Sequence, residues 1–166
     1  MIYVAVSGPG HASTEEEAMA EEVGRLLAEA GVVVVCGGTT GVMDAAARGA
    51  RAWGGTCIGI LPGTDRSEAS RHLTYSLPTG MNEGRNVLVA RAADALIAIS
   101  GEFGTLSEIA FARRVGVPVV GLRTWELRRW GEPVEAYVEA ATPEEAVEAA
   151  LRLAAGSPPS RRPDIP

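Results

Sequence analysis

Short apolar runs alternate with amphipathic stretches along almost the whole chain. The apolar runs lie at residues 2–6, 32–36, 56–61, 95–100 and 118–122, and a less regular run lies at 134–140. Continuous apolar runs of this length, several of them rich in β-branched residues, are typical of strands buried on both faces of a parallel sheet. Helical periodicity marks the intervening segments at residues 14–30, 41–53, 85–93, 106–115 and 142–155.

This alternation predicts the fold class. Strands followed by helices indicate an α/β protein of the Rossmann-like, doubly wound type, with a mainly parallel sheet and helices on both faces. The length of 166 residues suits a single domain. We place this domain at residues 1–155 and expect residues 156–166, which are rich in Pro, Ser and Arg, to form a flexible C-terminal tail.

Two segments do not fit the simple alternation. Residues 62–80 are polar and too long for an ordinary connection, so they are interpreted either as a lid or binding loop, or as a plain surface insertion. Residues 123–133 contain Trp125 and Trp130. These tryptophans are candidates for the interface of a homodimer or higher homo-oligomer, with ordinary packing of the C-terminal segment as the alternative.

Hydroxyl residues mark two of the expected helix starts. Thr14 with Glu17, and Thr142 with Glu145, have the spacing of a capping box, in which hydroxyl and acid each bind a backbone N–H group of the other. Pro143 follows directly, at a first helical position that favours proline. We therefore expect both threonines to cap helices.

The composition excludes several classes of protein. Apolar residues make up 46% and charged residues 22% of the chain, as in ordinary globular domains, and no apolar run is long enough to cross a bilayer. The chain starts directly with a strand-like run and shows no signal peptide, so we expect a cytoplasmic protein without a membrane partner. The net charge of −6 argues against a nucleic-acid partner.

All 15 positively charged residues are arginines, because the chain contains no lysine. Neither a lysine Schiff base to pyridoxal phosphate nor a Walker-type phosphate lysine is therefore available. Cys36 and Cys57 lie in or beside apolar runs and are expected to be buried thiols. His11 and His72 have no ligand spacing around them, so we predict neither a metal site nor a resident cofactor.

Three predicted strand-to-helix turns are rich in glycine and hydroxyl residues. They are residues 7–10 (Ser-Gly-Pro-Gly), 36–41 (Cys-Gly-Gly-Thr-Thr-Gly) and 100–105 (Ser-Gly-Glu-Phe-Gly-Thr). Ligands of open parallel sheets bind beyond the carboxyl ends of the strands, where such turns bring backbone N–H groups and helix N-termini close to an anion. One such turn alone is more simply explained by chain reversal and helix capping. Several at one edge predict a site for a phosphorylated, nucleotide-like small molecule.

A nicotinamide dinucleotide is a weak candidate for this ligand. The segment that begins at Gly8 lacks the third glycine of the G-x-G-x-x-G pattern. The second strand ends in Cys36-Gly37, where an acidic residue would bind the ribose of the dinucleotide.

Two charged residues, Arg85 and Glu108, stand near the starts of predicted helices on the ligand side. Arg85 is a candidate for holding a phosphate or stabilising a leaving base, and a solvated first-turn arginine is the alternative. Glu108 is a candidate for activating water or stabilising a positive sugar ring during glycosidic cleavage. Its spacing from Thr105 also fits a capping box, which is the structural alternative.

The glycine turns carry a family resemblance. Residues 37–43 (Gly-Gly-Thr-Thr-Gly-Val-Met) resemble the G-G-x-x-G-x-M turn of the LOG-like proteins of the SLOG superfamily, once named lysine decarboxylases. Arg85 and residues 100–108 resemble the arginine and the P-G-G-x-G-T-x-x-E signature of that family, and the similarity covers residues 1–122. It implies a Rossmann-like, usually dimeric fold. In the cytokinin-activating members it implies hydrolysis of a nucleoside 5′-monophosphate to free base and ribose 5-phosphate.

The resemblance implies that Arg85 and Glu108 are the catalytic pair. The turns and the resemblance together give the following candidate ligand-binding residues: Ser7, Gly8, Gly37, Gly38, Thr39, Gly41, Met43, Asn82, Gly101, Glu102, Gly104 and Thr105. The absence of lysine independently excludes pyridoxal-dependent lysine decarboxylation.

Three positions depart from the pattern of the cytokinin-activating enzymes. Ser100 replaces the proline of the signature, Glu102 replaces its second glycine, and Asn86 stands where those enzymes have lysine. A carboxylate at Glu102 would repel a phosphate in the usual place, unless it is turned away or binds a ribose hydroxyl. The pattern is closer to the uncharacterised, DprA-related branch of the superfamily, which also resembles the molybdenum-cofactor carrier proteins.

Three functional hypotheses result. The first is a nucleotide-binding, LOG-like phosphoribohydrolase that uses Arg85 and Glu108. The second is a non-enzymatic carrier or sensor of molybdenum cofactor or another phosphorylated small molecule. The third, single-stranded DNA binding as in DprA, is disfavoured by the acidic balance of the chain.

Overall fold

The computed structural model describes residues 1–156. Its main sheet has the strand order β4-β3-β2-β1-β5-β6-β9, and every neighbouring pair is parallel. The strands are β1 (Tyr3–Ser7), β2 (Val33–Cys36), β3 (Cys57–Leu61), β4 (Tyr75–Pro78), β5 (Ala95–Ile99), β6 (Val119–Leu122) and β9 (Val138–Ala140). The predicted parallel α/β class is confirmed, whereas residues 157–166 of the predicted tail lie outside the described residues.

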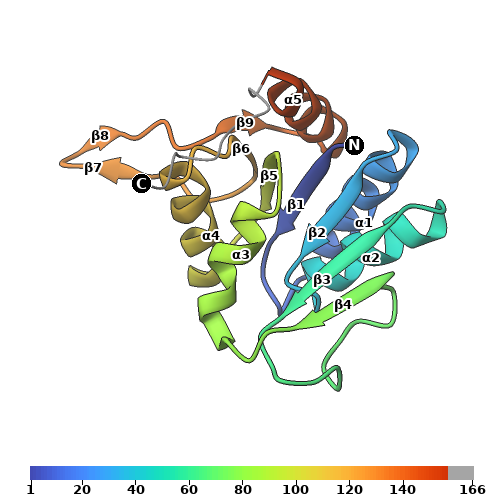
Figure 1. Cartoon of the computed structure of the whole chain (residues 1–166). Coiled ribbons are helices and arrows are strands. Elements are labelled where there is room, and N and C mark those ends of the chain that lie inside the picture. Colours follow the sequence, from blue (N-terminus) through green and yellow to red (C-terminus); the bar gives the residue numbers. More distant parts are fainter. Residues whose placement is uncertain (157–166) are drawn as a thin grey trace, which may run out of the picture.

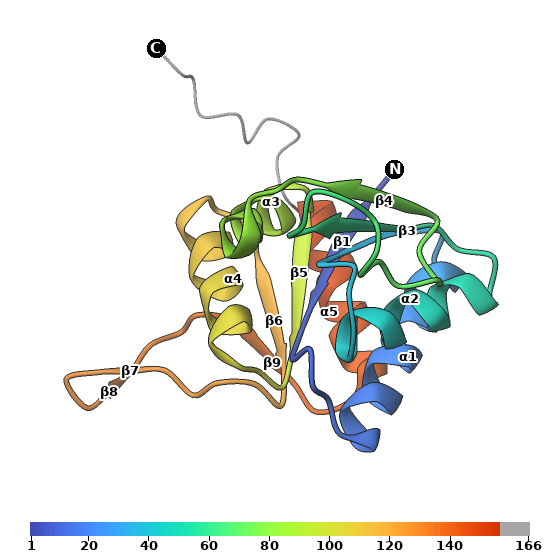
Figure 2. The same ribbon diagram turned by 90° about the horizontal axis from the view of Figure 1, so that it is seen from below.

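Helices cover both faces of this sheet (Figures 1 and 2). One layer consists of α1 (Thr14–Glu29), α2 (Val42–Ala52) and α5 (Pro143–Gly156), and the other of α3 (Asn86–Arg91) and α4 (Phe103–Arg114). The chain winds outward from β1 to β4 and then returns to β5 beside β1, so the strand order reverses there. In such sheets a crevice for ligands lies beyond the carboxyl ends of the two strands at the reversal. Within residues 1–156, no helix is long and apolar enough to span a membrane.

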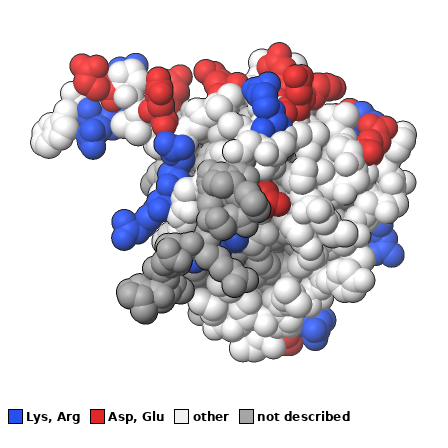
Figure 3. Space-filling model, turned by 45° about the horizontal axis from the view of Figure 1, so that its top comes forward, with Lys and Arg blue, Asp and Glu red and all other residues white. Residues whose placement is uncertain are grey.

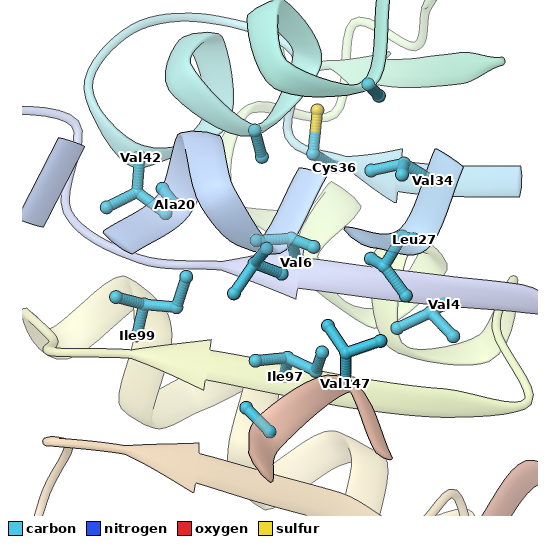
Figure 4. Packing of buried hydrophobic residues seen from close by; sticks show 14 of the residues in the cluster. Val4, Val6, Ala20, Leu27, Val34, Cys36, Val42, Ile97, Ile99 and Val147 are labelled. Carbon is cyan, nitrogen blue, oxygen red and sulfur yellow. The ribbon is translucent and has the colours of Figure 1, made fainter. Parts of the chain in front are cut away.

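The larger core fills the space between the sheet and the layer of α1, α2 and α5. Figure 4 shows side chains of neighbouring strands, Val4, Val6 and Ile97, pointing toward Leu27 of α1 and Val147 of α5. The strand residues and Leu27 are completely buried. Branched aliphatic side chains from two strands thus interlock with one stripe of each helix, which explains the continuous apolar runs of the sequence.

Helices α1 and α2 cross at two glycines. A Cβ atom at Gly24 would overlap the carbonyl oxygen of Ala46, and one at Gly49 would overlap that of Glu21. The two backbones can approach this closely only because both positions lack a side chain. This contact fixes the position of α2, whose N-terminal turn faces the crevice.

The polar segment 62–80 contains an edge strand that the hydrophobic pattern does not predict. Tyr75 and Leu77 of β4 are 61% and 51% exposed, so this strand lacks the continuous apolar run of a buried one. Pro78 ends the strand at the sheet edge, where a missing N–H group is tolerated. The loop before β4 is held to the body, because the Ser70 N–H group donates to the Gly38 carbonyl oxygen over 2.9 Å. The segment is therefore in part an edge of the sheet.

Two helix starts differ from the predictions. In α1 the capping box is formed by Ser13 and Glu16, one residue before the predicted pair of Thr14 and Glu17. Both pairs have the same spacing, so the pattern alone does not distinguish them. At α5 the Thr142 hydroxyl accepts from the N–H group of Glu145 over 3.3 Å, as predicted for a cap.

The helices near the crevice begin earlier than their apolar periodicity suggests. The predicted helix 85–93 is a 3₁₀ turn, η1 (Asn82–Arg85), followed by the short α3. The predicted helix 106–115 begins at Phe103, so Thr105 lies inside its first turn. Thr105 and Glu108 therefore do not form a capping box, and the capping alternative for Glu108 is wrong.

A hairpin projects from the body between β6 and β9 (Figures 1 and 2). It consists of β7 (Arg128–Arg129) and β8 (Glu132–Pro133), and we call residues 126–135 the arm. The predicted strand at 134–140 is correspondingly shorter, because only its last residues, β9, join the main sheet. Trp125 packs against Phe103, with ring centroids 5.6 Å apart, whereas Trp130 at the tip of the arm is 98% exposed. Ordinary packing of the C-terminal segment therefore explains Trp125 but does not explain Trp130.

Candidate functional site

A cleft of about 180 Å³ opens at the carboxyl ends of β1 and β5, where the strand order reverses. It is bounded by the turn after β1, the start of α2, the turn before α3 and the start of α4. Its lining residues are Gly8, Pro9, Gly10, Met43, Pro62, Asn82, Glu83, Arg85, Asn86, Glu102, Gly104, Thr105 and Glu108. The location agrees with the position expected for ligands in doubly wound sheets.

Glu108 lies at the inner wall of this cleft and is only 6% exposed. Its carboxyl group accepts a hydrogen bond from the Ser7 hydroxyl and one from the Arg85 guanidinium, whose Nη1 is 3.2 Å from Oε1. Burial raises the pKa of Glu108 to about 7, although Ser7 and Arg85 both favour the charged form. The side chain therefore changes its protonation state near neutral pH, as an acid or base in a catalytic site must.

Arg85 is held in place by its neighbours. Its Nη1 also donates to Oδ1 of Asn86 over 2.8 Å, and the amide nitrogen of Asn86 donates to the Ser107 hydroxyl over 2.9 Å. A Cβ atom at Gly37 would lie 2.5 Å from Nη2 of Arg85, so the glycine leaves room for the guanidinium. The arginine is thus a fixed, mostly buried cation rather than a solvated first-turn residue.

Two buried polar atoms in the cleft wall have no hydrogen-bond partner among residues 1–156. They are Nε of Arg85 and the hydroxyl oxygen of Thr105. Thr105 is 2% exposed, so leaving its hydroxyl unpaired costs free energy that a ligand would recover. Thr105 lies in the first turn of α4, where the backbone N–H groups favour an anion, and Arg85 is joined to the same helix through Glu108.

The predicted ligand-binding residues are only partly gathered here. Gly8, Met43, Asn82, Glu102, Gly104 and Thr105 line the cleft together with the predicted pair Arg85 and Glu108. Ser7 lies directly behind, bound to Glu108. Five more residues line the cleft that are not among the individually predicted ligand-binding residues: Pro9, Gly10, Pro62, Glu83 and Asn86. Pro9 and Gly10 belong to the predicted glycine turn 7–10, and Pro62 begins the possible binding loop 62–80. The sequence does hold one indication that Asn86 belongs to the site: it follows Arg85 at the position where the cytokinin-activating enzymes have lysine.

The other predicted residues lie beside the cleft rather than in its wall. Gly37, Gly38, Thr39 and Gly41 belong to the turn before α2, which packs against neighbouring segments: at Gly41, whose φ is 61°, a Cβ atom would overlap the carbonyl oxygen of Pro9. Gly101 is covered by the ring of Trp125. Direct ligand contact by these five residues stays a prediction.

Ser100 has a backbone conformation that explains one departure from the family signature. Its φ is 52°, in the left-handed region, whereas the ring of proline fixes φ near −65°. The Ser100 hydroxyl donates to Glu16 of α1, and its carbonyl oxygen accepts from the Thr124 hydroxyl. The turn before α4 therefore has a different path from one that contains proline, and it is tied to α1.

The charge around the cleft is mixed. Among residues 1–156, Arg85 is the only cation that lines it, while Glu83 and Glu102 add carboxylates at the exposed rim. Within residues 1–156 no cluster of three or more His, Cys, Asp or Glu side chains is arranged to hold a metal ion. Asp44 and His72, with 2.9 Å between Oδ1 and Nδ1, hold the loop before β4 against α2. Neither of these residues lines the cleft.

Fold and site together define a Rossmann-like α/β protein with a ligand cleft built around a buried glutamate–arginine pair. The chain belongs to the SLOG cluster4 family, whose model matches residues 1–150. The resemblance to LOG-like proteins is thereby confirmed.

Solved structures place the chain near molybdenum-cofactor proteins. The molybdenum cofactor binding protein of Rippkaea orientalis is 29% identical, with a TM-score of 0.83 over 92% of this chain and 96% of that one. The molybdenum cofactor carrier protein of Chlamydomonas reinhardtii is 31% identical, with a TM-score of 0.81 over 93% and 99% of the two chains. DNA processing protein A of Helicobacter pylori shares the fold alone, with 19% identity and a TM-score of 0.70.

Among curated sequences, a probable cytokinin riboside 5′-monophosphate phosphoribohydrolase of Oryza sativa is 32% identical over 106 residues. This match covers 62% of the present chain and 43% of the rice protein. An uncharacterised protein of Archaeoglobus fulgidus is 37% identical over 123 residues, which are 74% of this chain and 81% of that protein.

Proposed function

We propose that the cleft binds a nucleoside 5′-monophosphate and hydrolyses its N-glycosidic bond. The observation that carries this proposal is the buried Glu108, which has a pKa of about 7 and lies between Ser7 and Arg85 in the cleft wall. A fixed carboxyl group that titrates near neutral pH beside an arginine is suited to acid–base chemistry on a sugar. The rice relative, a probable phosphoribohydrolase, supports the same reaction class.

The phosphate group is assigned to the start of α4. Nε of Arg85 and the Thr105 hydroxyl supply unpaired donors, and the first-turn N–H groups of α4 supply a favourable dipole. The cleft volume of about 180 Å³ is below the usual range for a whole drug-sized ligand. It therefore encloses the ribose phosphate, and the base projects toward the open mouth.

In the reaction, the bond between C1′ and the base nitrogen breaks and its electron pair leaves with the base. The ionised Glu108 stabilises positive charge on the sugar ring and takes a proton from the attacking water, whose oxygen bonds to C1′. The proton that Glu108 takes from the water is then passed to the base nitrogen, so the carboxylate is regenerated and the products are free base and ribose 5-phosphate. Ser7 and Arg85 keep the carboxylate oriented throughout.

Release of ribose 5-phosphate from AMP and related monophosphates tests this proposal. We expect turnover by the wild type and loss of turnover by about a hundredfold or more in Glu108→Gln, because a general base is removed. Glu144→Gln, at the exposed start of α5 and outside the cleft lining, is the matched control and should retain activity. Turnover that is unchanged by Glu108→Gln would refute the mechanism, and absence of turnover on every monophosphate would refute hydrolysis.

A second candidate is a carrier of molybdenum cofactor or another phosphorylated small molecule that is bound without turnover. It is favoured by the two structural neighbours that bind or carry this cofactor, which match more than nine-tenths of the chain. Glu102 at the rim and Asn86 in place of lysine also weaken a purely hydrolytic site. Protection of molybdenum cofactor from oxidation by the purified protein supports carriage, whereas no protection and no thermal shift with phosphorylated ligands contradict it.

A further inference from the structure

A second pocket, of about 230 Å³, lies in the loop that joins β3 to β4. Leu61 and Pro62, at the end of β3, form its apolar wall. Its polar lining side chains are Thr64, Asp65, Ser67 and Glu68. Pro62 also lines the cleft, so the cleft and the second pocket adjoin at this residue. In Figure 1 the loop leaves the sheet where β3 ends, at the edge that carries the cleft.

Backbone hydrogen bonds fix the walls of the second pocket. The N–H group of Gly80 donates to the Gly63 carbonyl oxygen over 2.9 Å, and that of Asn82 donates to the Pro62 carbonyl oxygen over 3.0 Å. Asn82 itself lines the cleft, so the cleft and the second pocket share one bonded frame. The far end of the loop is held to the body through Ser70. A pocket that is already formed spends little free energy on ordering when a ligand enters.

The charged side chains of the second pocket are all carboxylates. Among residues 1–156, no arginine or histidine lines it. The Ser67 hydroxyl and the Ser67 N–H group, whose nitrogen is 2.8 Å from Oδ1 of Asp65, hold the pKa of Asp65 below its ordinary value. The Glu68 carboxylate has neither an ion pair nor a hydrogen bond within residues 1–156. On the arm, by contrast, acidic and basic side chains lie together (Figure 3).

This lining selects the chemistry of a ligand. An ionised carboxylate only accepts hydrogen bonds, and its two oxygens match two donors that lie side by side. Guanine presents such a pair on one edge, its N1–H group and its 2-amino group. Adenine and cytosine place their amino group beside a ring nitrogen that accepts, and uracil places its N–H group between two carbonyl oxygens. A base without the donor pair would leave a carboxylate unpaired, so the second pocket discriminates against it.

We propose that the second pocket holds the base of the nucleotide and that Asp65 and Glu68 select guanine through its N1–H and 2-amino donors. The ribose phosphate lies in the cleft and the base crosses Pro62. The cleft of about 180 Å³ and the second pocket of about 230 Å³ together reach the range of about 300–1,000 Å³ that is usual for a whole small-molecule ligand. This inference rests on the proposed function for the position of the phosphate, but the preference for a base is measured without turnover.

Titration calorimetry with intact monophosphates tests the preference for guanine. The full chain with Glu108→Gln is used, because it does not consume the ligand. We expect GMP to bind at least about tenfold more tightly than AMP, since AMP lacks the donor pair. IMP, which has the N1–H group but no 2-amino group, should lie between them. Equal affinities for GMP and AMP, or IMP bound as tightly as GMP, would overturn the proposal.

A double substitution in the same background tests the two carboxylates. Asp65→Asn with Glu68→Gln keeps the side-chain size, and the amide oxygen at position 65 can still accept from Ser67. The affinity for GMP should fall about tenfold or more, whereas those for AMP and ribose 5-phosphate should not change, which also shows that the variant is folded. Glu144→Gln, an exposed acid outside both hollows, is the matched control. Unchanged GMP affinity in the double variant would overturn the assignment.

Release of ribose 5-phosphate from GMP by the wild type separates this inference from the proposed function. Selective binding of GMP without release would support the second pocket as the base site and refute hydrolysis. Release from GMP and AMP alike, with equal affinities, would refute base selection and leave hydrolysis standing. If no monophosphate binds, both fail.

Pterins carry the same pair of donors as guanine, so neopterin distinguishes the two sources of this ring. We expect GMP to bind at least about tenfold more tightly than neopterin, because only GMP also has a phosphate for the start of α4. Neopterin that binds more tightly than GMP would assign the second pocket to a pterin and overturn its assignment to a guanine nucleotide.

Discussion

Glu108 is a carboxyl group that the fold keeps out of water while two donors hold it. Desolvation outweighs Ser7 and Arg85, so its pKa rises from an ordinary 4.5 to about 7. A folded-state pKa above the unfolded value means that protonation favours the folded state. The resulting stability is complete below about pH 4.5 and is lost as the pH rises through 7.

Glu108→Gln should therefore flatten the dependence of stability on pH. Between pH 4.5 and 7 the wild type should lose stability on the order of 3 kcal/mol from this group, whereas the neutral amide loses none. Urea unfolding at a series of pH values measures the difference. Parallel curves for the two proteins across this interval would show that Glu108 does not titrate as described.

Thr105 is predicted to matter for ligand and not for folding. Its hydroxyl has no partner among residues 1–156, so Thr105→Val should leave stability unchanged or raise it by up to about 1 kcal/mol. The affinity for ribose 5-phosphate should fall about five- to tenfold, measured by titration calorimetry. Thr124→Val is the control, because the Thr124 hydroxyl donates to the Ser100 carbonyl oxygen and its loss should cost about 1 kcal/mol. If Thr105→Val were destabilised and its affinity for ribose 5-phosphate were unchanged, the Thr105 hydroxyl would serve folding and not ligand binding.

At the scale of elements, the crossing of α1 and α2 depends on the absence of two side chains. Gly24→Ala should destabilise the protein by about 2–4 kcal/mol, although alanine has the better helix propensity, because its Cβ meets the backbone of Ala46. Ala18→Gly, at an exposed position of α1, isolates the propensity effect of about 1 kcal/mol. Denaturant unfolding checks both variants. A stabilised Gly24→Ala would mean that the two helices are not in contact there.

The sequence predicts the buried elements well because each buried strand is a continuous apolar run. It misses β4 and the arm, whose side chains face solvent on at least one side and leave no such run. The arm is also hidden because its turn contains Trp130-Gly131 instead of the asparagine-glycine pair typical of tight hairpins. The predicted start of α1 differs from the observed one by one residue, because only the spacing of the capping box indicates it. Ser13 with Glu16 and Thr14 with Glu17 have the same spacing.

At the scale of the whole molecule, the reversal of strand order assembles the site. Ser7 and Glu108 are 101 residues apart in sequence, yet their side chains are hydrogen-bonded because β1 and β5 are neighbours. The topology of a doubly wound sheet, inferred from the sequence, predicts that both residues lie at the ligand edge. It does not reveal their contact, the burial of Glu108 or the unpaired Thr105 hydroxyl, because these depend on where α4 begins and how it packs.

The central claim is that the cleft between β1, β5 and the start of α4 holds a phosphorylated ligand. A crystal structure of the protein with ribose 5-phosphate tests it most directly. We predict phosphate density within hydrogen-bond distance of the Thr105 hydroxyl and Nε of Arg85, with C1′ directed toward Glu108. Ligand density elsewhere on the molecule, or an empty cleft in crystals grown at saturating ribose 5-phosphate, would contradict the account.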